Sequence, residues 1–184
     1  CKGGLFSSWD RNSRTTWGAN GDAGQYLRVE PDGEAVMMDI DGPGVLYRVW
    51  SANPMGKIRI YLDGARTPSY EWNFPDLFDG NHPPFIKPLV YRRDRAQSAS
   101  DCYLPIPFAR HIKICADKPH VEYYHFNYVL FPKDRPVASF RLPLTAEEQS
   151  ALSAAADVWS HPGRDPKPRL PGQKTVSKTI TLAP

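Results

Sequence analysis

The sequence has few cysteines, no long apolar run and little net charge, and each absence excludes a class of protein. No apolar stretch approaches the roughly 20 residues that cross a bilayer, so we expect a soluble chain with no membrane span. The net charge is +3, from 23 basic and 20 acidic residues scattered along the chain. This charge is too small and too dispersed to indicate a nucleic-acid-binding surface. The three cysteines fit no zinc-binding spacing, so we expect neither a metal nor a cofactor.

Histidine is also scarce, with five residues in the chain. Four of them, His82, His111, His120 and His161, stand among turns or prolines, with no helical pairing and no convergent carboxylate motif. We therefore expect no metal-binding or catalytic role for these four.

A targeting segment is absent, and the first residue is Cys1 rather than Met. This start fits either a fragment boundary or a lipid-modified cysteine exposed by signal cleavage, and the second would place the protein in the periplasm or outside the cell. The other cysteines, Cys102 and Cys115, flank a segment that could form a hairpin near Phe108 and Ala109. They would then either form a disulfide or remain a reduced, buried pair.

Short segments of strand character, separated by turns such as "PDGE" and "DGPG", dominate the chain. With 19 Pro and 13 Gly, this pattern predicts an all-β fold, an antiparallel jelly-roll β-sandwich. The expected strands are Gln25–Glu30, Glu34–Ile40, Gly44–Ser51, Lys57–Asp63, Tyr70–Phe74, Cys102–Ile106, Ile112–Ala116, Val121–Phe131 and Thr175–Leu182.

One segment, "LTAEEQSALSAAADVWSH", predicts a C-terminal amphipathic helix, with Thr145 and Glu148 in capping-box positions. The expected order of domains is an N-terminal signature loop over 1–24, the jelly roll over 25–143, the helix over 144–163, a Pro-rich linker over 164–174 and, over 175–184, the first strand of a second jelly roll absent from this sequence.

Several segments occur together that resemble one bacterial family of glycoside hydrolases, long labelled a domain of unknown function. They are "SSWDRN…GANGD", "DGPGVLYRVWSANP", "IRIYLDGARTPSYEWNFPDLFDG", "PPFIKPLV", "CYLPIPFARHIKI" and "YYHFNYVLFP". Members act on α-D-fructofuranosyl and D-arabinofuranosyl linkages, as difructose-dianhydride synthases or hydrolases, exo-acting α-D-fructofuranosidases or arabinofuranosidases. The resemblance implies a double jelly roll whose subunits assemble as trimers or hexamers.

The same resemblance implies that the family's two catalytic glutamates lie in the second jelly roll, in "GEGD" and "GTED" type motifs. Neither motif occurs in this chain, so we assign no catalytic residue to it. The missing half would come from a following segment or from a second chain carrying the other jelly roll.

Most carboxylates of the chain have a structural explanation. Turn positions account for Asp41 and Asp63, and alternation with aromatic residues suggests that Glu71 and Glu122 face outward. Asp10 and Asp22 remain, in a segment with aromatic, amide and guanidinium groups suited to sugar hydroxyls.

The strand "VEYYHFNYVLF" adds a second candidate surface. Strict alternation places Tyr124, Phe126 and Tyr128 on a core face and Tyr123, His125 and Asn127 on the other, which is either a plain polar surface or the lining of a cleft. The substrate-binding candidates are Trp9, Asp10, Arg11, Asn20, Asp22, Trp50 and His125.

Two functions stay open at this point. In the first, the chain is the N-terminal jelly roll of a furanoside-cleaving hydrolase and orients a furanose-containing oligosaccharide or glycan. In the alternative, it is a non-catalytic jelly roll that binds glycans or assembles into capsid-like trimers. For Asp10, Arg11 and Asp22, the separate alternative to sugar binding is a structural network that pins the N-terminus onto the jelly roll.

Overall fold

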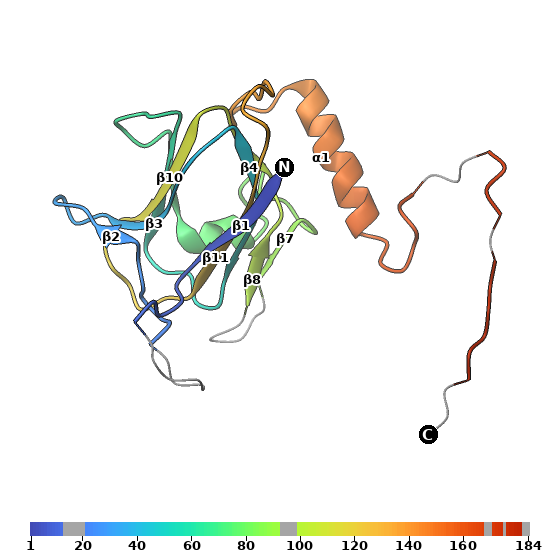
Figure 1. Cartoon of the computed structure of the whole chain (residues 1–184), viewed down its shortest axis with the longest axis horizontal. Coiled ribbons are helices and arrows are strands. Elements are labelled where there is room, and N and C mark those ends of the chain that lie inside the picture. The colour runs from blue at the N-terminus through green and yellow to red at the C-terminus, as the bar shows by residue number, and fades with distance from the viewer. Residues whose placement is uncertain (13–20, 93–98, 168–170, 175, 182–184) are drawn as a thin grey trace.

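The computed structural model describes residues 1–12, 21–92, 99–167, 171–174 and 176–181, which form two stacked antiparallel sheets with one helix beside them (Figure 1). In this part of the chain, sheet A has six strands in the order β1-β11-β4-β8-β7, with β9 also paired to β4. Sheet B has five strands in the order β2-β3-β10-β5-β6. The strands of sheet A are β1 (Lys2–Ser7), β4 (Gly44–Ser51), β7 (Val90–Arg92), β8 (Ser100–Cys102), β9 (Ile106–Phe108) and β11 (Tyr124–Leu130). Those of sheet B are β2 (Arg28–Val29), β3 (Ala35–Asp41), β5 (Lys57–Leu62), β6 (Tyr70–Asn73) and β10 (His111–Ala116).

The chain passes repeatedly between the two sheets. After β1 in sheet A it enters sheet B for β2 and β3, returns with β4, crosses again for β5 and β6, returns for β7 to β9, and ends with β10 in sheet B and β11 in sheet A. This interleaved order makes a jelly-roll sandwich, so the fold class predicted from the sequence is confirmed.

The core lies between the sheets and is built from every second residue of each strand, the residues whose side chains point inward. One inner row crosses sheet A through Phe6, Phe126, Val49, Cys102 and Val90, which pair in register. All but Phe6 are fully or almost fully buried. A 3-10 helix, η1 (Phe74–Phe78), adds three further buried side chains. The predicted core face of the "YYHFNYVLF" strand is confirmed for Tyr124 and Phe126, and Tyr128 packs partly buried against the same cluster.

Helix α1 (Ala146–Trp159) lies beside the sandwich rather than inside it (Figure 1). The predicted capping box is present: the Thr145 side chain accepts from the Glu148 backbone N–H, and the Glu148 carboxylate accepts from the Thr145 N–H at 2.7 Å. None of the helical residues is fully buried, although Leu152 packs against the core and the Trp159 ring lies 4.4 Å from that of Tyr103. In the described residues, no helix has the length and apolar character needed to cross a membrane.

Several strand predictions differ from the structure. The expected strand Gln25–Glu30 is reduced to Arg28–Val29, and β7 was not predicted. Lys2–Ser7, assigned to a loop, is strand β1, because it pairs along its whole length with β11. The expected strand Cys102–Ile106 is two strands, since β8 ends at Cys102 and β9 begins at Ile106, with Pro105 between them. Residues 176–181 form no strand, and Val176 and Ile180 are 91% and 70% exposed with no neighbouring strand to cover them.

The segment between Cys102 and Cys115 does not form the hairpin that its sequence left possible. Cys102 lies in sheet A and Cys115 in sheet B, because the chain crosses between the sheets after β9 instead of turning back. Both residues are free thiols and both are buried. The disulfide left open by the sequence is therefore absent, and the alternative of two reduced, buried thiols is the correct one.

These thiols give a direct chemical test. Burial raises the pKa of Cys102 and of Cys115 to about 12, so neither forms the reactive thiolate at neutral pH. We expect a thiol reagent such as DTNB to modify only the exposed Cys1 in the native chain, and all three cysteines in denaturant without reductant. A single reactive thiol in denaturant would contradict the absence of a disulfide.

The prediction that Glu122 faces outward is also wrong, whereas Glu71 does lie at the surface. Glu122 is fully buried, and it precedes β11 with the same parity as the core residues Tyr124 and Phe126. Its carboxyl accepts hydrogen bonds from the Tyr26 hydroxyl and the Met55 backbone N–H. Glu71 instead pairs at the surface with Lys57 and Arg59.

Candidate functional site

The outer face of sheet A carries a row of polar and aromatic side chains that runs across five strands. We call it the outer row. Ser7 of β1 pairs in register with His125 of β11, His125 with Trp50 of β4, Trp50 with Asp101 of β8, and Asp101 with Tyr91 of β7. Neighbours in register point to the same side of a sheet, and the adjacent row on each strand fills the core. The outer row therefore faces away from the core.

Asp101 is the best-anchored group of the outer row. Its side chain is 5% exposed and pairs with Arg48, whose Nε and Nη2 lie 2.9 and 2.8 Å from Oδ1. The Tyr91 hydroxyl donates to Oδ2 at 2.7 Å. Arg48 also donates to Asn127 Oδ1 at 3.1 Å, and its guanidinium lies 6.0 Å from the Tyr103 ring centroid. Two strands thus hold a fixed guanidinium on the outer face, with Asp101 compensating its charge.

Trp50 and His125 form the aromatic centre of the row. Their ring centroids are 4.6 Å apart with an interplanar angle of 35°, and both side chains are partly buried. Burial, assisted by the charge of Arg48, lowers the pKa of His125, while Asp101 and Asp22 act weakly in the opposite direction. A neutral imidazole offers one donor and one acceptor, a combination that suits a sugar hydroxyl.

The opening segment continues directly from β1 and lies at this end of the row. Asp22 Oδ1 accepts the Asp10 backbone N–H at 2.7 Å, which closes the segment on itself. Arg11 donates to the carbonyls of Ser7 and Trp9 and lies 5.3 Å from the centre of the Trp9 ring. Trp9 is 55% exposed, so one large ring stands in solvent beside carboxylate and guanidinium groups.

The structure therefore brings most of the predicted binding residues near one another. Trp9, Asp10 and Arg11 follow Ser7 at the end of β1, and Asp22 lies close enough to His125 to influence its pKa. Asn20 lies outside the described residues. Sequence reasoning did not select Arg48, Asp101 and Tyr91, although Arg48 stands two residues before Trp50 and thus on the same strand face.

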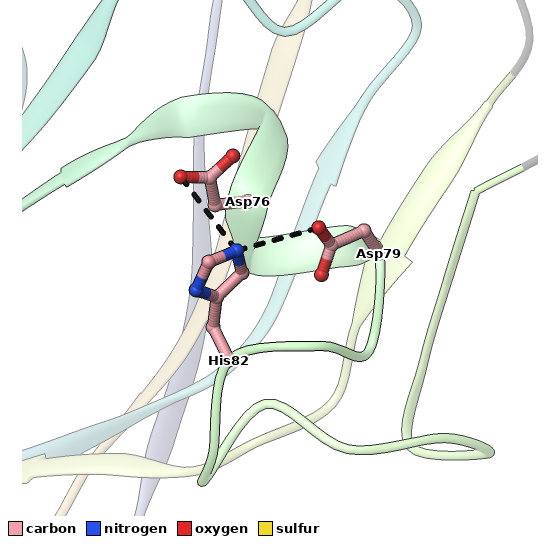
Figure 2. A group of neighbouring side chains, drawn as sticks. All are labelled: Asp76, Asp79 and His82. Atoms are coloured by element: carbon pink, nitrogen blue, oxygen red, sulfur yellow. Dashed lines mark ion pairs between the residues drawn. The ribbon is translucent and has the colours of Figure 1, made fainter.

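A separate cluster at the protein surface corrects one expectation about histidine. Figure 2 shows His82 between Asp76 and Asp79, with Nε2 3.9 and 3.5 Å from their respective Oδ2 atoms. His111 and His120 also contact carboxylates, those of Asp39 and Asp117. The expectation of no convergent carboxylates is therefore wrong for His82, whereas His111 and His120 each contact a single carboxylate.

The three groups Asp76, Asp79 and His82 lie close enough to share a metal ion. Asp76 and Asp79 are partly buried and His82 is exposed, however, and exposed acidic groups are common without a metal. We assign no ligand to them.

An apolar groove of about 600 Å³ adjoins the outer face of sheet A beneath α1. Tyr47, Tyr103 and Trp159 supply its aromatic lining, and Leu152 and Ala155 its helical wall. Tyr103 also contacts Arg48, so groove and outer row share a boundary. The groove's lining has few polar groups, unlike the outer row.

The fold and the outer face together define a β-sandwich domain that presents aromatic rings, carboxylates and a guanidinium, the groups with which proteins bind sugars. Residues 1–148 match the GH172 first beta-sandwich domain. The chain belongs to glycoside hydrolase family 172, and the glycoside-hydrolase resemblance seen in the sequence is confirmed at that level. No curated protein matches the chain.

Proposed function

We propose that this domain binds and orients the substrate of a furanoside-cleaving glycoside hydrolase, acting on α-D-fructofuranosyl or D-arabinofuranosyl linkages. The observation that carries the proposal is the gathering of Trp9, Asp10, Arg11 and Asp22 at the end of the outer row that holds Trp50 and His125. The family match supports carbohydrate as the ligand class.

In this proposal the exposed rings accept the apolar faces of the sugar. Carboxylate oxygens of Asp10 and Asp22 accept from ring hydroxyls, and neutral His125 donates or accepts one further hydrogen bond. Asp101 is already engaged by Arg48 and Tyr91, so it positions the guanidinium instead of attacking the anomeric carbon.

Catalysis then requires carboxylates from elsewhere. A retaining glycosidase uses two carboxyl groups about 5–5.5 Å apart as nucleophile and acid/base. We propose that the catalytic glutamates come from a second jelly roll, on a following segment or on another chain of a trimer or hexamer. The alternative is a glycan-binding or assembly module without catalysis, which the same outer face could also serve.

An assay separates the two functions. The chain is incubated alone, and with the segment that follows it or a partner chain, on p-nitrophenyl α-D-arabinofuranoside and on fructo-disaccharides. We expect hydrolysis only in the combined sample. Hydrolysis by the isolated chain would contradict our placement of the catalytic groups, and binding without hydrolysis in every combination would favour the non-catalytic module.

Arg11 provides a mutational test of the binding role. Arg11→Ala removes a guanidinium that touches two backbone carbonyls, and we expect sugar affinity to fall about tenfold, because one charge-assisted contact contributes about 1.5 kcal/mol. The melting temperature should stay within about 4 °C, since the backbone carbonyls that Arg11 touches belong to its own segment and its one core partner, the Tyr124 hydroxyl, also donates to the Gln25 carbonyl. Arg66→Ala, in an exposed turn of sheet B, is the matched control. A large loss of stability with unchanged affinity would mean that the segment only fastens the N-terminus.

A further inference from the structure

Glu122 is a buried carboxyl at which three separate stretches of the chain meet. Its Oε1 lies 3.1 Å from the Tyr26 hydroxyl oxygen, and its Oε2 accepts from the Met55 backbone N–H at 3.2 Å. Its backbone carbonyl accepts from the Gly24 N–H at 2.9 Å. A single residue thus connects the segment 24–26, the loop 52–56 and the stretch that leads into β11.

The hydrogen bonds around Tyr26 fit the neutral form of Glu122. The Tyr26 hydroxyl oxygen lies 2.8 Å from the His120 backbone N–H, 3.0 Å from the His120 carbonyl oxygen and 3.1 Å from Glu122 Oε1. A tyrosine hydroxyl has one proton and two lone pairs. If Glu122 is protonated, it donates to Tyr26, and Tyr26 donates to the carbonyl, so that every group is paired.

Ionisation of Glu122 removes this match. The Tyr26 proton must then serve either the carboxylate or the His120 carbonyl, and the other acceptor loses this partner at a part-buried position. Among the described residues, no lysine or arginine bonds to this carboxyl. The charged groups that face it are His120 and Asp117, which pair with each other at 2.9 Å, and the neighbouring tyrosines are Tyr26 and Tyr124.

The network adjoins the candidate site on two sides. Gly24 follows Asp22 by two residues, and loop 52–56 continues from Trp50 and the end of β4. Within that loop, Asn53 donates to the Val121 carbonyl at 2.7 Å and accepts from the Tyr123 N–H at 2.9 Å. A change that breaks the hydrogen bonds of Glu122 therefore affects both the segment 24–26 and the loop 52–56, which adjoin the candidate sugar-binding residues.

We propose that Glu122 is a positioning residue and a protonation-dependent latch: its neutral form holds segment 24–26 and loop 52–56 together, and its ionisation releases them. The consequence for sugar binding rests on the function proposed above. In that case, the binding face is ordered in mildly acidic solution and loosens in mildly alkaline solution.

The direction of the pH effect follows from the carboxyl's environment. Burial, which dominates over the hydrogen bonds from Met55 and Tyr26, raises the pKa of Glu122 to about 7, well above its ordinary value of 4.5. A group whose pKa is higher in the folded than in the unfolded state stabilises most below the unfolded value. The latch is therefore strongest below about pH 4.5 and is lost as the pH rises through about 7.

Hydrogen exchange measured by NMR tests the latch without any sugar. We expect the protection factors of the Gly24 and Met55 amides to fall at least tenfold between pH 5 and pH 8, after correction for intrinsic exchange. Glu122→Gln places an amide that donates to Tyr26 and accepts from Met55, so its protection should not change with pH. Glu71→Gln, at an exposed carboxyl, should keep the wild-type response. A pH-independent wild type, or a Glu122→Gln variant that still loses protection, would overturn the proposal.

A parallel titration with methyl α-D-arabinofuranoside separates the latch from the proposed function. We expect the affinity to fall at least tenfold from pH 5 to pH 8 in the wild type and to stay constant in Glu122→Gln. If the amides respond as expected but no sugar binds at either pH, the latch is supported and the proposed function fails.

Discussion

Replacing Asp101 with alanine lowers the free energy of unfolding by about 3 kcal/mol, because it leaves a partly buried guanidinium without its counter-charge. The Asp101 side chain is 5% exposed, and its oxygens accept from Arg48 and from the Tyr91 hydroxyl. Both donors lose their partner at once in the variant. The quantity is measured by urea denaturation at neutral pH.

Glu71→Ala is the matched control for this prediction. Glu71 also pairs with two cations, Lys57 and Arg59, but it lies on the exposed face of sheet B with 35% of its side chain accessible. Solvent screens such pairs, so we expect a much smaller loss of stability. Equal losses for the two variants would show that the Asp101 pair has no special structural role.

Replacing Trp50 with alanine weakens sugar binding by about tenfold or more while the sandwich stays folded. Trp50 lies at the centre of the outer row, and its ring packs against that of His125 rather than into the core. Its removal takes away the apolar surface on which a sugar ring would stack and also frees the imidazole. Isothermal titration with methyl α-D-arabinofuranoside and methyl α-D-fructofuranoside measures the effect.

Trp50→Phe and Trp159→Ala sharpen this test. Phenylalanine keeps a flat ring, so Trp50→Phe should retain most of the affinity. Trp159, a tryptophan of the apolar groove, is 45% exposed and thus more accessible than Trp50, and its replacement should leave sugar binding unchanged. If Trp159→Ala weakens binding more than Trp50→Ala, the sugar lies in the groove beneath α1 instead of on the outer row.

Sequence patterns predicted those strands and that helix whose formation depends on neighbouring residues. Alternation and turn residues gave strands such as Gly44–Ser51 correctly, and the capping box placed the start of α1. Alternation also carried the prediction for His125, which shares a strand with buried Tyr124 and Phe126 but faces the opposite side.

Pairings between strands that are far apart in the sequence could not be predicted from local sequence patterns. Asp101 joins Trp50 only because β8 pairs with β4 in one particular register, and no feature near Asp101 in the sequence specifies that partner. Cys102 and Cys115 were placed in one hairpin for the same reason, since sequence spacing does not show that the chain changes sheets between them.

Glu122 shows how a correct pattern can still mislead. Its parity with Tyr124 and Phe126 points to the core, but a charged residue ordinarily faces water, and that preference favoured the surface. The structure compensates its burial with Tyr26, almost a hundred positions away, and with the Met55 backbone. Neither partner is visible from the sequence around Glu122.

The most direct test of the central claim is an NMR titration of the chain with methyl α-D-arabinofuranoside and methyl α-D-fructofuranoside. The account predicts chemical-shift changes at the Trp50 indole, the His125 ring and the Arg11 and Asp22 amides, with none at Lys57 and Glu71 on the outer face of sheet B. Shift changes confined to sheet B or to the groove beneath α1, or none at sugar concentrations of tens of millimolar, would contradict it.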